Sequence, residues 1–501
     1  MYKQLILLCS LIFLLYPVQA EQVKFTILQA NDVYEMSPVN GGRYGGLARV
    51  KTLMDELRAE NPNFISVLAG DLFSPSAIGT AVVNGEPLNG KQMVDVLNQM
   101  GWDYFTLGNH EFDNGEGALI QRLSEARFKT ITSNVRQTST CHFKRKVHRA
   151  SACKLFPNTQ DTDVIAVEDI KVGLAAITLQ ALAKDFATIA DPVREARRAI
   201  RQLRRKQADV ILMITHQGMG EDKVFAETVD EIDLILGGHE HDNNYLRRGS
   251  EFTPVAKADS NARSVYIHRI TYDTETQQVD VNSELKIVDH TVPEDPKIKK
   301  VVDEWTQKAF DGFRAAGSDP DVFIAQVTED LDGLEASVRN KSTKFTKLVA
   351  RSAISVLPGS ELSIVNSGGI RIDDILTPDQ PVIGYDMIRT FPFSDTTYAQ
   401  VKISGWTLQE AFDQGNAYVG AGSYLHHANV TQDDGGAWLI NGEALEPDRV
   451  YTVAIMSFLI DYGDDGLDML VASKNPDVQE TGMARVDARD ALAKELQATY
   501  P

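Results

Sequence analysis

The amino-acid sequence predicts an α/β protein of two domains joined by a connector helix. Its 501 residues exceed what one hydrophobic core usually supports, so two domains are expected. Over residues 23–290, short apolar runs alternate with amphipathic helical stretches, which is typical of an α/β domain with a parallel or mixed sheet. A charged segment that contains two prolines, residues 292–296, then separates this region from the rest of the chain.

Six short apolar runs of the N-terminal region are predicted to be strands, with amphipathic helices between them. The strands are Phe25–Leu28, Phe64–Leu68, Tyr104–Leu107, Leu174–Ile177, Val210–Ile214 and Ile232–Leu236, and the helices include Leu47–Leu57, Lys91–Met100 and Pro192–Lys206. One further helix is predicted from Lys297 to about Phe313, because apolar residues recur at helical spacing until Gly317 and Pro320 end the pattern. We therefore divide the chain into a signal segment over 1–20, a first domain over 21–293, a connector helix over 294–319 and a second α/β or α+β domain over 320–501.

The first twenty residues predict export. Lys3 precedes an almost unbroken apolar run from Leu5 to Leu15, and Val18-Gln19-Ala20 offers small residues at the spacing of a cleavage site. No later stretch approaches the roughly 18 apolar residues of a membrane span. The mature protein is therefore expected to be periplasmic or secreted, without a stable membrane anchor. The formal net charge of -20 argues against a nucleic acid polymer as a partner, because phosphate backbones require a basic surface.

Only two cysteines, Cys141 and Cys153, remain after the signal segment is removed. In an oxidising compartment we favour a disulfide that closes a small surface loop, and two unpaired thiols are the alternative. A free-thiol titration of unfolded, unreduced protein separates the two.

Five predicted strands end in polar residues of a particular kind. These endings are Asn31-Asp32-Val33-Tyr34, Gly70-Asp71, Gly108-Asn109-His110-Glu111, His216 and Gly237-Gly238-His239-Glu240-His241. Because ligands bind at the carboxyl edge of α/β sheets, five such endings indicate one convergent site. Carboxylate, carboxamide and imidazole groups suit divalent or trivalent first-row metals. A carboxylate can also bridge two ions, which together promote in-line displacement at phosphorus.

The order of these residues resembles the signature of the metallophosphoesterase superfamily: Asp-x-His, Gly-Asp, Gly-Asn-His-Glu, His and Gly-His-x-His. The extended motifs at 108–113, 215–216 and 237–241 are similar to its 5'-nucleotidase family in particular, and the resemblance covers essentially the whole mature chain. It implies an N-terminal metallophosphoesterase sandwich, with two sheets flanked by helices, and a C-terminal α+β domain that binds the substrate.

The resemblance also implies a role for each matching residue. Two metal ions, zinc, manganese or iron, would share Asp71. Their remaining ligands would be Asp32 and His241 at one ion, and Asn109, His216 and His239 at the other. His110 would stabilise the transferring phosphoryl group and the leaving oxygen, and Asp113 would orient its imidazole.

One position departs from the family pattern, because Tyr34 stands where the first motif has its histidine. A phenol is a poor ligand for Zn²⁺ or Mn²⁺ until it loses a proton of pKa about 10. Tyr34 could ligate as tyrosinate, which favours a harder ion such as Fe(III) and would give a purple protein. It could instead hydrogen-bond a metal-bound water and leave a site of lower affinity, or it could mark a degenerate, weakly active site.

In the second domain, Asn366-Ser367-Gly368-Gly369-Ile370-Arg371 follows the strand-like run Leu362–Val365. A Gly-Gly turn before an arginine lets both the backbone and the guanidinium approach an anionic ligand. The segment is similar to the family's Asn-x-Gly-Gly-Ile-Arg, which implies substrate contacts for Asn366, Gly369 and Arg371.

The resemblance implies further substrate contacts in this domain. Phe393 and Phe458 would stack on the two faces of a nucleobase, and the alternative is that both rings belong to the core. Asp464 and Asp465 are both candidates to hold the sugar or base, because an apparent insertion has changed the family's Gly-Gly-Asp-Gly motif. Arg339 stands nine residues before Leu348, as the family's arginine does, although the surrounding segment departs from the pattern.

Together these features predict an exported enzyme that hydrolyses nucleoside 5'-monophosphates to nucleoside and phosphate, by attack of metal-bound hydroxide on a small nucleotide-like substrate. A related ester is the first alternative: a cyclic nucleotide, a nucleotide-sugar pyrophosphate, or a sulfate or thiosulfate ester. A nucleotide-binding protein with vestigial catalysis is the alternative from another class, motivated by Tyr34 and the altered C-terminal motifs.

Overall fold

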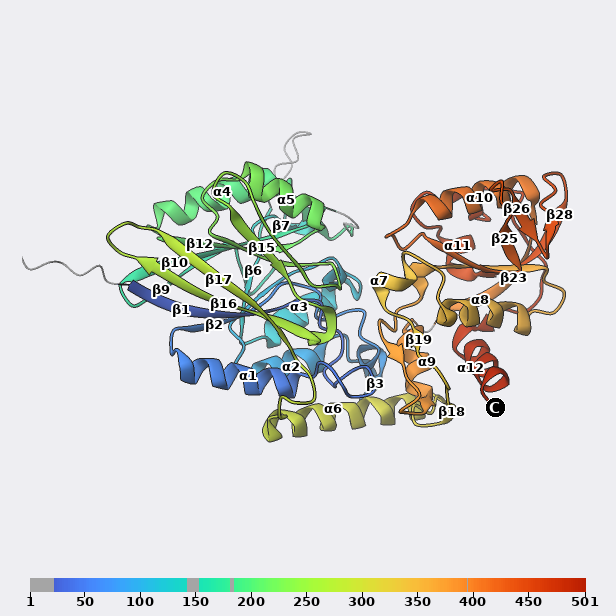
Figure 1. The fold of residues 1–501 in the computed structure, drawn as a ribbon, viewed down its shortest axis with the longest axis horizontal. Coiled ribbons are helices and arrows are strands. Elements are labelled where there is room, and N and C mark those ends of the chain that lie inside the picture. Colours follow the sequence, from blue (N-terminus) through green and yellow to red (C-terminus); the bar gives the residue numbers. More distant parts are fainter. Residues whose placement is uncertain (1–21, 142–152, 181–183, 394) are drawn as a thin grey trace, which may run out of the picture.

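The computed structural model describes residues 22–141, 153–180, 184–393 and 395–501, so the predicted signal segment lies outside the described residues. Two domains lie side by side, and helix α6 (Pro296–Ala315) runs along the first and ends beneath the second (Figure 1). The predicted connector over 294–319 contains this helix. The boundaries proposed at residues 293 and 320 stay predictions.

Two stacked sheets form the centre of the N-terminal domain. The first has the strand order β17-β16-β1-β2-β5-β6-β8, and the second has the order β14-β15-β13-β12-β10-β9. The strands of the first sheet are β1 (Gln22–Ala30), β2 (Phe64–Leu68), β5 (Tyr104–Thr106), β6 (Lys129–Ile131), β8 (Thr159–Gln160), β16 (Ser264–Asp273) and β17 (Val279–Ile287). Those of the second are β9 (Thr162–Val167), β10 (Ile170–Thr178), β12 (Val210–His216), β13 (Leu234–Gly238), β14 (Asn244–Arg248) and β15 (Thr253–Lys257).

Apolar side chains fill the space between the sheets and cover their outer faces. Phe25 and Val67 of the first sheet belong to one buried cluster with Leu174 and Leu212 of the second. The helices α1 (Leu47–Glu60), α2 (Lys91–Met100) and α3 (Gly115–Glu125) pack with α6 on the first sheet, and α4 (Pro192–Arg205) and α5 (Met219–Thr228) pack on the second. The sandwich of two sheets flanked by helices, which the resemblance implied, is therefore confirmed.

Parallel pairing brings the carboxyl ends of the central strands to one edge. Strands β1, β2 and β5 are parallel in the first sheet, and β10, β12, β13 and β15 are parallel in the second. The prediction of a strand over Ile232–Leu236 was wrong at both ends, since β13 covers Leu234–Gly238. Its two glycines continue the ladder by pairing with Thr215 and His216 of β12, so the strand reaches the site itself.

The C-terminal domain is built on a mixed sheet with helices on both faces. Its strand order is β24-β20-β28-β23-β29, with β30 also pairing with β23. These strands are β20 (Leu362–Asn366), β23 (Thr397–Ser404), β24 (Leu425–Ala428), β28 (Val450–Met456), β29 (Gln479–Glu480) and β30 (Val486–Asp487). The helices α8 (Lys344–Val356) and α12 (Ala488–Thr499) cover one face, and α10 (Gly405–Ala417) and α11 (Ser457–Asp461) cover the other. The expected α+β character of this domain is confirmed.

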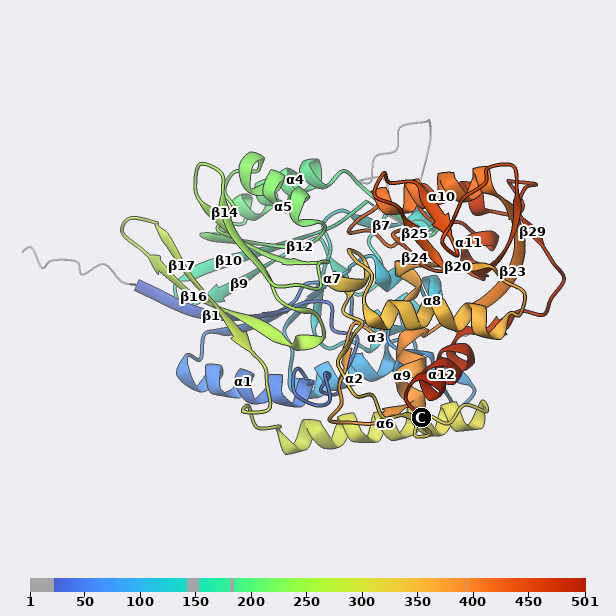
Figure 2. The same ribbon diagram turned by 45° about the vertical axis from the view of Figure 1, so that its right-hand side comes forward.

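Short elements connect the main ones. The remaining helices are α7 (Glu335–Val338) and α9 (Gly384–Thr390), with the 3-10 turns η1 (Ile78–Thr80), η2 (His110–Phe112), η3 (Thr138–Thr140), η5 (Ser260–Ala262), η6 (Ser367–Gly369) and η7 (Asp468–Leu470). The remaining strands are β3 (Val82–Val83), β4 (Glu86–Pro87), β7 (Val135–Gln137), β11 (Ala187–Ile189), β18 (Phe323–Ala325), β19 (Leu331–Asp332), β21 (Ile375–Leu376), β22 (Val382–Ile383), β25 (Val430–Gln432), β26 (Trp438–Ile440) and β27 (Glu443–Ala444). Figure 2 shows α7, which leads into the C-terminal domain, facing the N-terminal domain.

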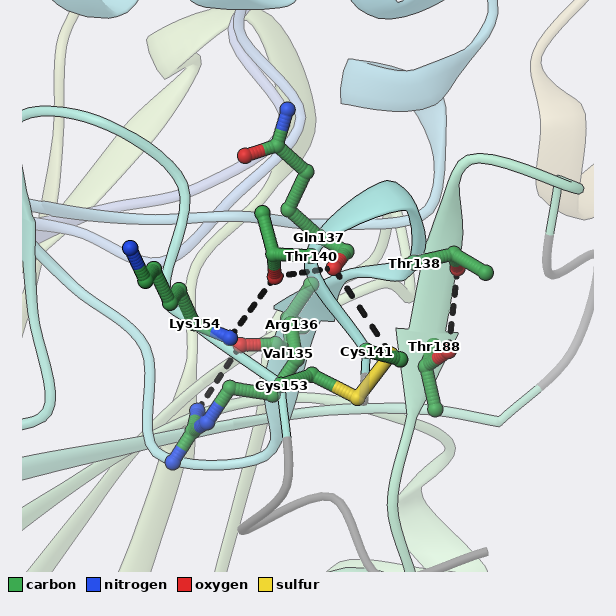
Figure 3. Close-up of a disulfide and its surroundings, with 9 residues drawn as sticks. All are labelled: Val135, Arg136, Gln137, Thr138, Thr140, Cys141, Cys153, Lys154 and Thr188. Atoms are coloured by element: carbon green, nitrogen blue, oxygen red, sulfur yellow. Dashed lines mark hydrogen bonds between the residues drawn. A yellow bond between two sulfur atoms is a disulfide. The ribbon is translucent and has the colours of Figure 1, made fainter. Parts of the chain in front are cut away.

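Cys141 and Cys153 form a disulfide beside β7 (Figure 3), as expected. Next to the disulfide, the Thr140 hydroxyl accepts a hydrogen bond from the backbone N–H of Lys154 at 2.8 Å, which also joins the two segments that carry the cysteines. In the part of the chain that the structure describes, no helix combines the length and the apolar character that crossing a bilayer requires.

Candidate metal centre

The predicted metal ligands meet at the carboxyl ends of both sheets. Asp32 follows β1, Asp71 follows β2, Asn109 follows β5, His216 ends β12, and His239 directly follows β13. The two sheets are tied together at this edge, because the backbone carbonyl of Ala69 lies 2.7 Å from His216 Nδ1. The backbone N–H of His239 in turn donates to Asp32 Oδ2 at 2.9 Å.

A first group of donor atoms surrounds the Tyr34 hydroxyl. This oxygen lies 3.3 Å from Asp32 Oδ1, 3.0 Å from Asp71 Oδ2 and 3.1 Å from His241 Nε2. Tyr34 is itself buried, with 6% of its surface exposed. The phenol oxygen therefore lies among the donor groups predicted for the first ion.

A second group surrounds Asn109. Its side-chain oxygen lies 3.2 Å from His216 Nε2 and 3.2 Å from His239 Nδ1. His216 Nε2 is also 3.2 Å from Asp71 Oδ2. A single oxygen of Asp71 thus lies close to donor atoms of both groups, which is the position expected of a bridging carboxylate.

The donor set fits two cations. Atoms bound to one ion at about 2.0–2.2 Å lie roughly 3–3.5 Å from one another, and most of the separations above fall in this range. Asp32, Asp71 and His216 offer ligand atoms that all lie within 4.8 Å of one another, and all three side chains are buried. Two carboxylates buried this close together are stabilised by a bound cation, by a neighbouring protonated histidine or by a shared proton.

Burial and mutual contact shift the proton affinities of these groups. Burial alone would lower the pKa of His216, but Asp71 and Asp32 raise it to about 10. Burial likewise opposes protonation of His241, while the carboxylates of Glu335 and Asp373 raise its pKa to about 9. Burial, followed by Asp71 and Asp32, raises the pKa of the Tyr34 phenol well above its usual value.

The backbone at the ligands is held in an uncommon conformation. Asp32, Asp71 and His239 have φ angles of 51°, 56° and 87°, in the left-handed region that non-glycine residues rarely adopt. Glycines make the tight approach possible, since a Cβ on Gly108 would overlap the Asp71 carboxylate and one on Gly70 would overlap the His216 ring. The backbone conformation and the close glycine contacts thus fix where the predicted ligands lie.

Glu111 holds the two loops that carry Asp71 and Asn109, a role that the sequence analysis missed. Its buried carboxylate accepts hydrogen bonds from the backbone N–H groups of Asp71 at 3.0 Å, Leu72 at 2.7 Å, Phe73 at 3.0 Å and Gly108 at 2.6 Å. Burial and the neighbouring Asp71 raise its pKa to about 7. Its place in the Gly-Asn-His-Glu motif was the signal that could have found it.

His110 and Asp113 form the expected pair beside the ligands. His110 Nδ1 lies 2.6 Å from Asp113 Oδ2, and the backbone N–H of His110 donates to Asp71 Oδ1 at 2.9 Å. The other ring nitrogen, Nε2, lies 3.2 Å from Arg371 Nη2. Arg371 belongs to the C-terminal domain, so the two predicted halves of the site are in contact.

The other residues predicted to contact the substrate also belong to the C-terminal domain. Arg339 Nη2 lies 2.9 Å from Glu335 Oε2, and Arg371 Nη1 lies 4.0 Å from the same oxygen. Asn366, at the end of β20, donates to Asp464 Oδ2 at 2.8 Å, whereas Asp465 is exposed. Gly369 lies in η6, where a Cβ would overlap the sulfur of Met456.

The two predicted stacking residues are exposed, which contradicts the alternative that both rings belong to the core. Phe393 and Phe458 expose 42% and 45% of their surface. Phe393 precedes β23 and Phe458 follows β28, and these strands are antiparallel with Tyr398 opposite Met456, so both rings lie at the same edge of the sheet. Because β20 is parallel to β28, Asn366 lies at this edge too.

A two-sheet sandwich with these donors at its carboxyl edge defines a metallophosphoesterase. Comparison with known families agrees, since the calcineurin-like phosphoesterase family matches residues 25–243 and the 5'-nucleotidase C-terminal domain matches residues 323–472. The chain belongs to the 5'-nucleotidase family of the metallophosphoesterases, and it is a phosphoric ester hydrolase.

Individual relatives share this organisation over nearly their whole length. The chain is 23% identical to 5'-nucleotidase of Bos taurus, over 97% of this chain and 91% of the relative, and 26% identical to 5'-nucleotidase of Vibrio cholerae, over 95% and 91%. The solved structure of a 5'-nucleotidase precursor from Thermus thermophilus has a TM-score of 0.75 at 21% identity and covers 95% of this chain and 97% of its own. A sulfate thiohydrolase SoxB from the same genus has the same fold, with a TM-score of 0.70 at 15% identity and coverage of 95% and 94%.

Proposed function

We propose that the protein is an exported 5'-nucleotidase that hydrolyses nucleoside 5'-monophosphates to nucleoside and phosphate. The observation that carries the proposal is the 3.2 Å contact between His110 of the catalytic domain and Arg371 of the C-terminal domain. It joins a residue beside the metal ligands to a guanidinium suited to a phosphate. The substrate phosphate would therefore bind between the domains, with the nucleoside extending along the C-terminal sheet edge.

The metal ligands follow from the donor groups already described. Asp32, Tyr34, Asp71 and His241 would hold one ion, and Asp71, Asn109, His216 and His239 the other. Two such cations would neutralise the phosphoryl oxygens and lower the pKa of the attacking water. Zinc, manganese and iron all suit the carboxylate, carboxamide and imidazole groups of this set. Tyr34 suits a harder ion such as Fe(III), and only once its phenol has lost a proton. A purple colour in the iron-loaded protein, lost in Tyr34→Phe, would assign Tyr34 as a tyrosinate ligand, and a colourless iron-loaded protein would leave it as a hydrogen-bond donor to water.

The residues around the ions would divide the remaining work. His110 would stabilise charge on the leaving oxygen, and Asp113, through its 2.6 Å contact, would hold the proton on Nδ1. Arg371 would pair with the phosphate, and Arg339 would support it from beside Glu335. Asn366, Gly369 and the two aspartates, Asp464 and Asp465, would contact the ribose or base.

The exposed rings of Phe393 and Phe458 give the sharpest test of nucleotide specificity. Stacking of one base on an aromatic ring contributes about 1–3 kcal/mol, so Phe393→Ala or Phe458→Ala is expected to raise the KM for AMP roughly 5- to 150-fold. Ribose 5-phosphate has no base to stack, and its KM is expected to stay within about twofold. Steady-state release of phosphate from both substrates measures the difference.

Trp406 supplies a matched control. It exposes 63% of its surface and follows β23 at the opposite edge of the sheet, so Trp406→Ala is expected to leave both KM values unchanged. Equal changes for AMP and ribose 5-phosphate in the phenylalanine variants would contradict the stacking role. Faster turnover of a cyclic nucleotide, a nucleotide-sugar pyrophosphate or a thiosulfate ester than of AMP would contradict the nucleotidase proposal.

Export is the second part of the proposal, and it rests on the apolar segment at residues 5–15 behind Lys3. A mature chain that begins near residue 21 and is found outside the cytoplasm would support it. An intact chain confined to the cytoplasm would contradict it.

A further inference from the structure

Asp373 belongs to the C-terminal domain, but its side chain is inserted into the catalytic domain. It exposes 6% of its surface. Its Oδ2 lies 3.3 Å from Arg263 Nη1 and accepts a hydrogen bond from the Ser260 hydroxyl, and Arg263 also donates to the Asp373 backbone carbonyl. The residue sits two positions after Arg371 with a left-handed φ of 40°. The backbone turn that presents Arg371 to His110 thus also places a carboxylate in the neighbouring domain.

This carboxylate faces the outer nitrogen of a predicted metal ligand. His241 directs Nε2 toward the centre, 3.1 Å from the Tyr34 hydroxyl. Its Nδ1 points away and lies 3.4 Å from Asp373 Oδ2 and 3.4 Å from Glu335 Oε2. Both carboxylates come from the C-terminal domain. Among the described residues this buried nitrogen makes no hydrogen bond, so these two carboxylates, each at ion-pair distance, are the acceptors placed to take its proton.

Of the two carboxylates, Asp373 is the better fixed acceptor. Glu335 is already paired with Arg339 at 2.9 Å, on a helix of four residues. Asp373 is anchored on both oxygens, because Oδ1 accepts the backbone N–H of Glu335 at 2.9 Å while Oδ2 contacts Arg263 and Ser260. A metal-binding histidine needs such a partner, since an acceptor at the outer nitrogen fixes both the tautomer and the ring orientation.

We infer that Asp373 is a positioning residue that orients the metal ligand His241 from across the domain interface. The inference rests on the proposed function, because it takes His241 as a ligand. It adds that one of the two ion sites is complete only while the C-terminal domain is docked. Binding of that ion and docking of the domain therefore favour each other, by the reciprocity that links any two coupled equilibria.

The adjacent residue Asp374 provides a matched control for loosening of the interface. It is also buried, with 2% of its surface exposed, and it also joins the domains. Its Oδ1 accepts the backbone N–H of Asn40 at 2.9 Å and its Oδ2 contacts Arg389 Nη2 at 2.6 Å, and neither contact involves His241. A variant at Asp374 therefore removes an interdomain anion without removing the acceptor for the ligand.

The test is metal affinity, measured by dialysing chelator-treated full-length protein against Co²⁺ and counting bound ions by mass spectrometry. Asp373→Ala is expected to weaken the binding of one of the two ions about 10- to 100-fold. Asp373→Asn is expected to recover most of this loss of affinity, because its amide oxygen can accept a hydrogen bond from Nδ1. Asp374→Ala is expected to leave the affinity for both ions within about threefold of the wild-type value. Wild-type affinity in Asp373→Ala, or equal losses in Asp373→Ala and Asp374→Ala, would overturn the inference.

Two further measurements separate the possible failures. If His241→Ala keeps both ions, the proposed ligand set is refuted. If His241→Ala loses one ion while Asp373→Ala binds both ions with wild-type affinity, only the positioning role of Asp373 is refuted. Hydrogen exchange of the wild-type protein needs no variant to fold. Co²⁺ is expected to slow exchange in the peptide around residues 371–376, and unchanged exchange there would contradict the coupling.

Discussion

Asp71→Asn is expected to abolish binding of both ions at ordinary concentrations and to lower phosphate release at least about a thousandfold. Asp71 is the proposed bridging carboxylate, and its Oδ2 lies 3.0 Å from the Tyr34 hydroxyl in one donor group and 3.2 Å from His216 Nε2 in the other. An amide of the same shape keeps the packing but carries no charge, and only one of its two terminal atoms can ligate. Metal content by mass spectrometry and turnover of AMP and an aryl phosphate measure both effects.

Asp95→Asn is the control for this substitution. Asp95 accepts a hydrogen bond from the Trp305 indole on α6 at 2.8 Å, which an amide oxygen can also accept. This variant is expected to keep both ions and full activity. If Asp71→Asn kept two ions per chain with unchanged turnover, the shared carboxylate would be excluded.

His110→Ala is expected to lower kcat about 10²- to 10⁴-fold while leaving both ions bound. The side chain lies beside the ligands, and the Asp71 carboxylate is held by the backbone N–H of His110, which alanine retains. The lost group is the imidazole that faces Arg371 at 3.2 Å and would stabilise the leaving oxygen. The metal content of the variant therefore separates this effect from that of Asp71→Asn.

The exposed His290 serves as the comparison, and His290→Ala is expected to behave as the wild type. The kcat of Asp113→Asn is expected to lie between those of His110→Ala and His290→Ala, because this variant keeps the His110 imidazole but removes the carboxylate that orients it. A His110→Ala variant with wild-type kcat, or one that loses metal to the same extent as Asp71→Asn, would refute the separate role of His110.

Local patterns were enough to predict the catalytic domain and the gathering of its ligands. Apolar runs that end in Asp32, Asp71, Asn109, His216 and His239 are strands of two sheets, and parallel pairing brings their ends to one edge. The information is local because each residue follows its own strand directly. The error in the predicted end of β13 also has a local cause. Glycines usually end a strand, but Gly237 and Gly238 continue this one.

The groups that hold the ligands could not be predicted in the same way. The Gly-Asn-His-Glu motif marks Glu111 as a residue of interest, but three of its four backbone N–H donors lie some 40 positions away in the chain, and such hydrogen bonds leave no residue-type pattern at the donors. Asp373 meets His241 only because the two domains dock, and no spacing in the sequence encodes that contact. The role of Tyr34 depends on three neighbours from separate loops, so the substitution was visible in the sequence but its surroundings were not.

The shared carboxylate is tested most directly by electron paramagnetic resonance of the protein loaded with two equivalents of Mn²⁺. Two ions bridged by Asp71 are expected to give an exchange-coupled signal in the wild type, and Asp71→Asn is expected to lose it. A wild-type spectrum that contains only isolated Mn²⁺ ions at full loading would contradict the dinuclear centre.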